Sequence, residues 1–393
     1  MNGHTESYTI DGRLFRRVRN GLAAIAAAGW LASAAGLRLD PARFHASYLV
    51  AFVFFVTLVL GALFFTMLQH LTGAAWSVTM RRVAENAMAA IPLGAALFIP
   101  IALGLPSLYE WARPEAVAAD PVLQGKAAFL NPQFFILRSA LNFALWSLWA
   151  LRLYRNSVRG RGLVACQSSQ RWSAPGMVVL TLTVALASFD WLMSLDPHWY
   201  STMFGVYVYS GAALAFVAAL TLILLALRRA NVLREAVTPE HYHDLGKWMF
   251  ALTVFWAYIA FSQYMLIWYA NLPEETVWFR DRLAGSWREI SLALVIGHFL
   301  VPFFVLISRG AKRRLGVLAA AAVWVLLMQY TDLYWIAMPV FSKGSATPRW
   351  VDLAALAAVG GTFGLVFWLR LGAHPLAPID DIRFEKSLEF TNV

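Results

Sequence analysis

The feature that most constrains this 393-residue chain is a series of apolar stretches, each about 20 residues long, that recurs from end to end. A helix of about 20 apolar residues crosses the hydrocarbon core of a bilayer. The chain is 60% hydrophobic and only 14% charged, whereas about a quarter of the residues in soluble domains are charged. We therefore expect an all-α polytopic membrane protein with ten transmembrane helices, near residues 20–37, 46–70, 86–104, 132–152, 175–195, 203–227, 245–270, 287–308, 315–338 and 350–371.

The connections between these stretches are short, so residues 1–393 are expected to form one integral membrane domain. It comprises an N-terminal segment over 1–19, the ten-helix region over 20–371 and a tail over 372–393. Most of the 32 lysines and arginines fall in alternate connections that include both ends of the chain. Cytoplasmic loops retain positive charge, so both termini are predicted to be cytoplasmic, in a bacterial inner membrane. The basic residues form no single stripe, which argues against a nucleic-acid partner.

Covalent and metal-bound cofactors are not expected on this chain. The single cysteine, Cys166, excludes an internal disulfide, an iron-sulfur cluster held by this chain alone, and c-type haem, which needs a CxxCH motif. A b-type haem needs two facing histidines inside the membrane, and His298 is the only histidine predicted near the middle of a helix. The first twenty residues contain no small-residue cleavage site after a short apolar core, so we expect no removed signal peptide.

Three ionisable side chains are predicted to lie inside helices at one depth. Arg138, Asp190 and Asp332 each fall six residues from the predicted outer end of a helix, which is roughly 9 Å at ~1.5 Å per residue. Charges in such positions cost several kcal/mol and are functional candidates. If the three helices adjoin, these residues form a buried ion-paired cluster. It would serve either a proton or quinone site, or a structural salt bridge that holds the bundle together.

Three more candidates lie on two other predicted helices. His298 lies roughly 16 Å deep; it would either relay protons, because its pKa is near neutrality, or pack as a histidine bonded to a backbone carbonyl. Glu289 precedes it by nine residues, which places the two on nearly opposite faces of a straight α-helix. Tyr258 would either make hydrogen bonds between helices or line a polar path.

Residues 188–201 (SFDWLMSLDPHWYS) concentrate polar side chains around a predicted outer helix end. The Asp-Pro pair ends the helix and directs Asp196 and His198 to the membrane surface. A carboxylate and an imidazole in this position would accept protons from a hydroquinone-like donor and pass them outward. The alternative is a capped turn between two helices.

The residues 188–211 (SFDWLMSLDPHWYSTMFGVYVYSG), 245–279 (LGKWMFALTVFWAYIAFSQYMLIWYANLPEETVWF) and 328–339 (MQYTDLYWIAMP) resemble a known family. They are similar to the ActF family, the NrfD-like membrane subunits of bacterial alternative complex III, a quinol:cytochrome c oxidoreductase, and the resemblance extends over about 47–338. It implies two four-helix bundles among the ten helices. It also implies partners: a multihaem cytochrome c, an iron-sulfur subunit and the paralogous NrfD-like subunit ActC.

The resemblance implies a membrane subunit, not catalytic alone, in a respiratory or photosynthetic electron-transport chain. Its expected contribution is quinone interaction or proton transfer near the periplasmic side, while haem c and iron-sulfur clusters belong to the partner subunits. Two alternatives from the residues remain open. Ten helices with buried charges also suit a proton-coupled secondary transporter, and the same charges would suit a purely structural scaffold surrounded by membrane lipids. The candidate residues for a proton path or a quinone site are Arg138, Asp190, Asp196, His198, Tyr258, Glu289, His298 and Asp332.

Overall fold

The computed structural model describes residues 8–392, and within them ten helical spans are long and apolar enough to cross a membrane. The predicted fold class is confirmed: the chain is an all-α polytopic membrane protein. Six spans are single helices: α1 (Gly12–Leu39), α2 (Pro41–Leu71), α9 (Pro132–Arg159), α11 (Phe204–Arg229), α12 (Pro239–Ala270) and α18 (Trp350–Leu371). The remaining four are built from more than one piece: α3 (Val78–Met88), α4 (Ile91–Leu97) and α5 (Ile99–Leu103); α10 (Gly162–Trp191) followed by η2 (Met193–Leu195); α14 (Trp287–Ala293), η3 (Leu294–Leu300) and α15 (Val301–Ile307); and α17 (Leu315–Ala337) followed by η4 (Met338–Val340).

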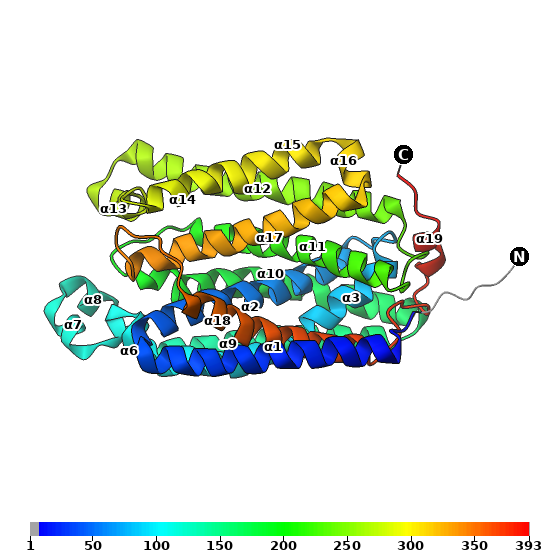
Figure 1. The fold of residues 1–393 in the computed structure, drawn as a ribbon, viewed down its shortest axis with the longest axis horizontal. Coiled ribbons are helices and arrows are strands. Elements are labelled where there is room, and N and C mark those ends of the chain that lie inside the picture. Colours follow the sequence, from blue (N-terminus) through cyan, green and yellow to red (C-terminus); the bar gives the residue numbers. More distant parts are fainter. Residues whose placement is uncertain (1–7, 393) are drawn as a thin grey trace, which may run out of the picture.

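The spans pack as two adjacent groups of four (Figure 1). In the first bundle α2 packs on α3 and α10, and α9 packs on α4 and α10. In the second bundle α11 packs on α12 and α17, and α15 packs against α12 and α17 as well. The bundles join where α11 lies against α2 and α10. This arrangement contains the two four-helix bundles that the resemblance implies.

The first and last spans, α1 and α18, form a pair on the outside of α2 (Figure 1). Glycines let their backbones approach closely: a Cβ added to Gly29 would lie 2.3 Å from the Ala358 nitrogen, and one added to Gly361 would lie 2.6 Å from the Ala26 nitrogen. Small residues of this kind drive helix association where lipid removes the hydrophobic driving force. The two ends of the membrane region are thereby joined.

The two ends of the bundle differ in character. The start of α1 and the C-terminal helix α19 (Phe384–Leu388) lie at one end, which we call the termini end (Figure 1). At the opposite, far end, α7 (Pro114–Ala119) and α8 (Pro121–Lys126) project beyond the spans, and α13 (Pro273–Arg282) caps the second bundle. Both far-end segments belong to connections that were predicted to join helices at their outer ends.

The third span departs from its predicted bounds. It begins at Val78 rather than near residue 86, and all eleven residues of α3 are buried, including Arg81 and Arg82. These arginines were expected in an exposed basic connection. The same span breaks into α3, α4 and α5 around Pro92 and Pro100, because proline cannot donate the backbone hydrogen bond that continues a helix.

Candidate functional site

A large cavity that suits an apolar ligand lies in the second bundle. Its volume is about 690 Å³, and it opens between α12 and the span formed by α14 and η3, beneath α13. Cavities of 300–1,000 Å³ with mostly apolar walls and a few polar groups are typical of small-molecule sites. The walls are largely aromatic and aliphatic: Val254, Trp256, Tyr258, Phe261, Tyr264, Phe279, Leu283, Leu292, Leu294, Val295, Phe299, Leu300 and Trp335.

Tyr207 and Trp256 join this cavity to a polar group at the centre of the bundle. Each of the four spans contributes one side chain: Tyr207 from α11, Trp256 from α12, His298 from η3 and Asp332 from α17. The Tyr207 hydroxyl donates a hydrogen bond to the Asp332 carboxylate. The Trp256 ring lies 5.7 Å from the Tyr207 ring and 3.9 Å from the His298 ring, between ring centroids. All four side chains are buried.

Both ring nitrogens of His298 lack a hydrogen-bond partner among residues 8–392, whereas the Trp256 indole interacts with Tyr207 and Asp332. Buried polar atoms are paired in the great majority of cases, because leaving one unpaired costs roughly 1–3 kcal/mol. His298 is thus the member of the group whose polar atoms are unsatisfied by the described residues. The backbone-carbonyl bond considered for His298 is not formed within residues 8–392, although the ring is buried and packs on Trp256.

The helix around His298 is a π-helix, not an α-helix. Leu294–Leu300 forms η3, with Gly297 and His298 buried, and its wider turn is a feature often found at functional sites. The straight-helix argument that separated Glu289 from His298 by face therefore does not apply. Glu289 is in any case exposed and does not line the cavity.

Arg282 supplies a positive charge to the cavity at the far end of the bundle. It is 2% exposed, and its guanidinium donates to the carbonyl oxygens of Trp335, Trp278 and Ile336. The guanidinium carbon lies 3.4 Å from the centre of the Trp278 ring, a cation–π contact. Burial lowers the pKa of Arg282 to about 9, and the neighbouring carboxylates of Asp196 and Asp281 oppose this shift, so the group remains charged at neutral pH.

The three predicted buried charges do not form one cluster. Arg138 and Asp190 are a bidentate ion pair in the first bundle, with Nε to Oδ2 at 2.8 Å and Nη2 to Oδ1 at 2.7 Å. Arg138 also donates to the Phe129 carbonyl. Asp332 is instead bonded to Tyr207 in the second bundle. The cluster was expected only if the three helices adjoin, and Asp332 lies apart because equal predicted depth does not make helices adjacent.

Asp196 and His198 are not paired with each other. The His198 imidazole lies 2.6 Å from Asp120 Oδ2, in the far-end segment that carries α7 and α8. Burial raises the pKa of Asp196, against the opposing effects of the Arg282 charge and the His198 backbone N–H. The turn therefore joins the far-end segment to α10, and the Asp196 carboxylate is within electrostatic reach of the cavity arginine.

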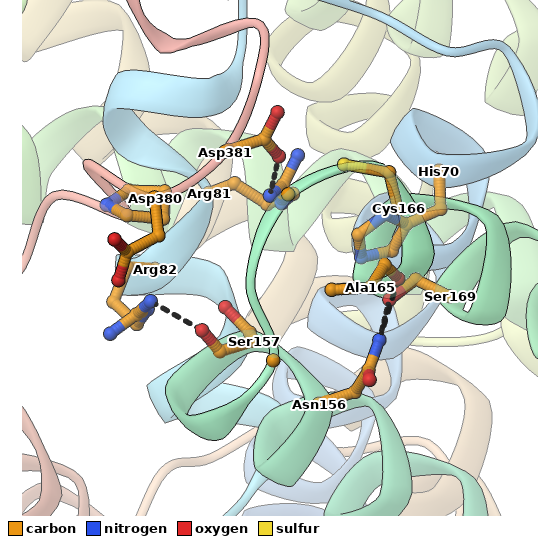
Figure 2. Close-up of a pocket in the computed structure, with 13 residues that line it drawn as sticks. His70, Arg81, Arg82, Asn156, Ser157, Ala165, Cys166, Ser169, Asp380 and Asp381 are labelled. Carbon is orange, nitrogen blue, oxygen red and sulfur yellow. Dashed lines mark hydrogen bonds and ion pairs between the residues drawn. The ribbon is translucent and has the colours of Figure 1, made fainter.

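A second buried polar cluster lies at the termini end of the first bundle (Figure 2). Glu85 is fully buried and pairs with Arg81 at 3.0 Å and with Arg82 at 3.3 Å, and Arg81 also reaches Asp381 at 2.7 Å. Beside them, the ring nitrogens of His70 have no hydrogen-bond partner within residues 8–392, and His70 Nε2 lies 3.9 Å from Glu85 Oε1. The cavity here is about 30 Å³, enough for one or two water molecules.

Four residues of these sites, Tyr207, Trp256, Arg282 and Glu85, were not among the candidates predicted from the sequence. Tyr207 and Trp256 look like ordinary aromatic residues in apolar helices, and only their placement beside Asp332 and His298 gives them a role. Arg282 and Glu85 fall at helix ends, where a charge is expected to be solvated. In the sequence, the only indication is that Tyr207 and Asp332 each fall within one of the segments that resemble the family.

Among residues 8–392, no three histidine, cysteine, aspartate or glutamate side chains lie close enough to hold a metal ion. Comparison of the sequence with protein-family models finds no matching family, and no curated protein matches it. The family resemblance therefore stays a prediction that rests on the quoted segments.

Proposed function

We propose that this chain is a membrane subunit of a quinol:cytochrome c oxidoreductase of the alternative complex III type, and that a quinol binds in the cavity of the second bundle. The observation that carries the proposal is the cavity of about 690 Å³, with an aromatic wall and a buried Tyr207–Asp332 pair at its inner side. An apolar ring with two hydroxyl groups and an isoprenoid tail suits these walls, since apolar contacts bind the ring and tail and few polar groups set the orientation.

The two polar ends of the cavity suit the two oxygens of a quinol. At one side Tyr207 is hydrogen-bonded to Asp332; at the far end lie Arg282 and Ser291. A quinol hydroxyl beside Tyr207 would pass its proton to the tyrosine oxygen while the tyrosine proton moves to the Asp332 carboxylate. Asp332 then acts as the base through Tyr207, and must release this proton before it accepts the second one.

Oxidation of one quinol also releases two electrons, which we propose pass to haem c or iron-sulfur clusters on partner subunits. The single cysteine cannot alone hold an iron-sulfur cluster or provide the CxxCH motif of a c-type haem. The subunit would then bind the quinol and take its protons, and would not be catalytic alone.

The proposed setting is a bacterial inner membrane, with the termini end cytoplasmic and the far end periplasmic. Most lysines and arginines fall in the connections on the side of the termini, as the positive-inside rule requires. In this orientation the cavity and Arg282 lie in the periplasmic half, so that protons from the quinol are released outward.

The test uses the complex purified through a tag on this subunit, with quinol:cytochrome c turnover as the readout. Asp332→Asn and Tyr207→Phe should lower turnover by about 10²-fold or more, the usual effect of removing a general base, with the haem content unchanged. Leu292→Trp should fill the cavity and raise KM for quinol. Leu182→Trp is the matched control, because Leu182 is an exposed leucine on α10 outside the cavity.

Different outcomes would exclude the quinol role of the cavity and the assembly of this chain into an oxidoreductase complex. Unchanged turnover in Asp332→Asn, Tyr207→Phe and Leu292→Trp would exclude a quinol role for this cavity. If the tagged subunit purifies without any haem-containing partner and catalyses proton-coupled solute uptake in vesicles, the complex itself is excluded and the transporter alternative is correct.

A further inference from the structure

A third cavity lies at the termini end, and its Tyr154 is within electrostatic reach of Arg82 and Glu85 of the second polar cluster. Its volume is about 310 Å³, and it is formed by the last turns of α9 and α18. Its lining residues are Leu151, Tyr154, Arg155, Val158, Arg159, Arg370 and His374. No acidic residue lines it, and three of its seven lining residues are arginines.

The three arginines are free to bind a ligand. None of the guanidinium groups of Arg155, Arg159 and Arg370 forms a hydrogen bond or an ion pair with another residue in the described range 8–392. Arg81, at the same end, is by contrast paired with Glu85 and Asp381. The C-termini of α9 and α18 each contribute about half a negative charge, which the three guanidinium charges exceed. The cavity is therefore strongly electropositive.

The remaining walls are aromatic or aliphatic. The Arg370 guanidinium carbon lies 5.8 Å from the centre of the Tyr154 ring, and the Tyr154 ring lies 6.4 Å from that of His374. Leu151 and Val158, on α9, complete the apolar part of the lining. Because both helices are membrane spans and the cavity lies at their ends, its charged part is at the level of the lipid headgroups.

We propose that this cavity binds the headgroup of an anionic phospholipid. The phosphate would lie between the guanidinium groups of Arg155, Arg159 and Arg370, which bind phosphate oxygens with geometric fit. The first acyl carbons would follow Leu151 and Val158. Basic pockets between membrane helices are a recognised way to bind doubly charged lipid headgroups, and three unpaired arginines suit diphosphatidylglycerol better than a lipid with one phosphate. The apolar wall favours a lipid over free phosphate.

The test measures lipid binding to the detergent-purified protein by native mass spectrometry, with added diphosphatidylglycerol as the probe. The double variant Arg159→Gln/Arg370→Gln should bind it about thirty-fold more weakly, since each basic residue near the membrane surface contributes about a factor of five. The control is Arg161→Gln/Arg171→Gln, which removes the same charge from two exposed arginines outside the cavity. This control should bind the lipid like the unmodified protein.

Two further measurements identify the ligand chemistry. Phosphatidylcholine, which is zwitterionic, should bind equally weakly to all three proteins, and inorganic phosphate at millimolar concentration should not displace diphosphatidylglycerol. The proposal is overturned if both double variants lose the lipid equally, if neither does, or if inorganic phosphate displaces it, because the cavity would then be a general or a free-anion site. Equal thermal unfolding of the variants establishes that they are folded.

Discussion

The Arg138–Asp190 pair allows a quantitative test of what a buried charge does in this fold. Arg138 is 8% and Asp190 0% exposed, and two hydrogen bonds of 2.8 and 2.7 Å join them. Asp190→Leu would leave the Arg138 guanidinium buried without its carboxylate. Removing one partner of a buried pair costs about 3–5 kcal/mol. Because Arg138 keeps the Phe129 carbonyl and lies 3.9 Å over the Phe129 ring, we expect the lower end, about 3 kcal/mol.

The double variant Arg138→Met/Asp190→Leu supplies the comparison. Apolar residues of similar volume often replace a buried ion pair at no net cost, so this variant should unfold within about 1 kcal/mol of the unmodified protein. The assay is equilibrium unfolding by denaturant in detergent micelles, followed by helical circular dichroism, and the double-mutant cycle gives the coupling. A cost below about 1 kcal/mol for Asp190→Leu, or a double variant as unstable as that single one, would refute a structural role for the pair.

Two other predictions concern close packing and pH. Gly29→Ala should destabilise the α1–α18 pair by about 1–3 kcal/mol, the usual cost of overpacking, whereas Gly21→Ala, which meets nothing within 4 Å, should be neutral or slightly stabilising in the same unfolding assay. Burial raises the pKa of Asp381, but hydrogen bonds from Arg383 and the charge of Arg81 outweigh this and hold it well below its usual range. The C-terminal segment should therefore stay ordered above about pH 4 and lose order as the pH falls further. Amide hydrogen exchange over 376–388 would detect this as a loss of protection. In Asp381→Asn the protection of these amides should be low at every pH, and a variant that keeps the native dependence of protection on pH would contradict the predicted role of Asp381.

The number of spans was predictable because it depends on a local property. A run of about 20 apolar residues is long enough to cross the bilayer whatever its neighbours are, and all ten predicted spans have a counterpart. The bounds were less predictable at the termini end. There Arg81 and Arg82 were expected in a basic connection. Inside the protein, however, Arg81 pairs with Glu85 and Asp381, and Arg82 pairs with Glu85. Charge alone cannot reveal a partner that is about 300 residues away.

The candidate site was predictable only in part for a related reason. Burial depth identified Asp332 and His298 as exceptional side chains, and both lie at the centre of the second bundle. Their neighbours depend on which helices adjoin and on how each helix is rotated. The π-helix at Leu294–Leu300 changes the rotation, and no residue pattern in the sequence announces it. Tyr258 on α12 lines the cavity together with residues of α13 and of the π-helical span, whose placement against α12 the sequence does not specify locally.

The pairing of α1 with α18 has a consequence for biosynthesis. The two helices meet through Gly29 and Gly361, yet almost the whole chain separates them in the order of translation. The first span therefore enters the bilayer with the surface around Gly29 unfilled, and it stays so until the last span is inserted. Chains that end before Trp350 should leave this surface open to lipid or to other helices, which makes them substrates for membrane quality control. Closure of this helix pair thus waits for insertion of the span Trp350–Leu371.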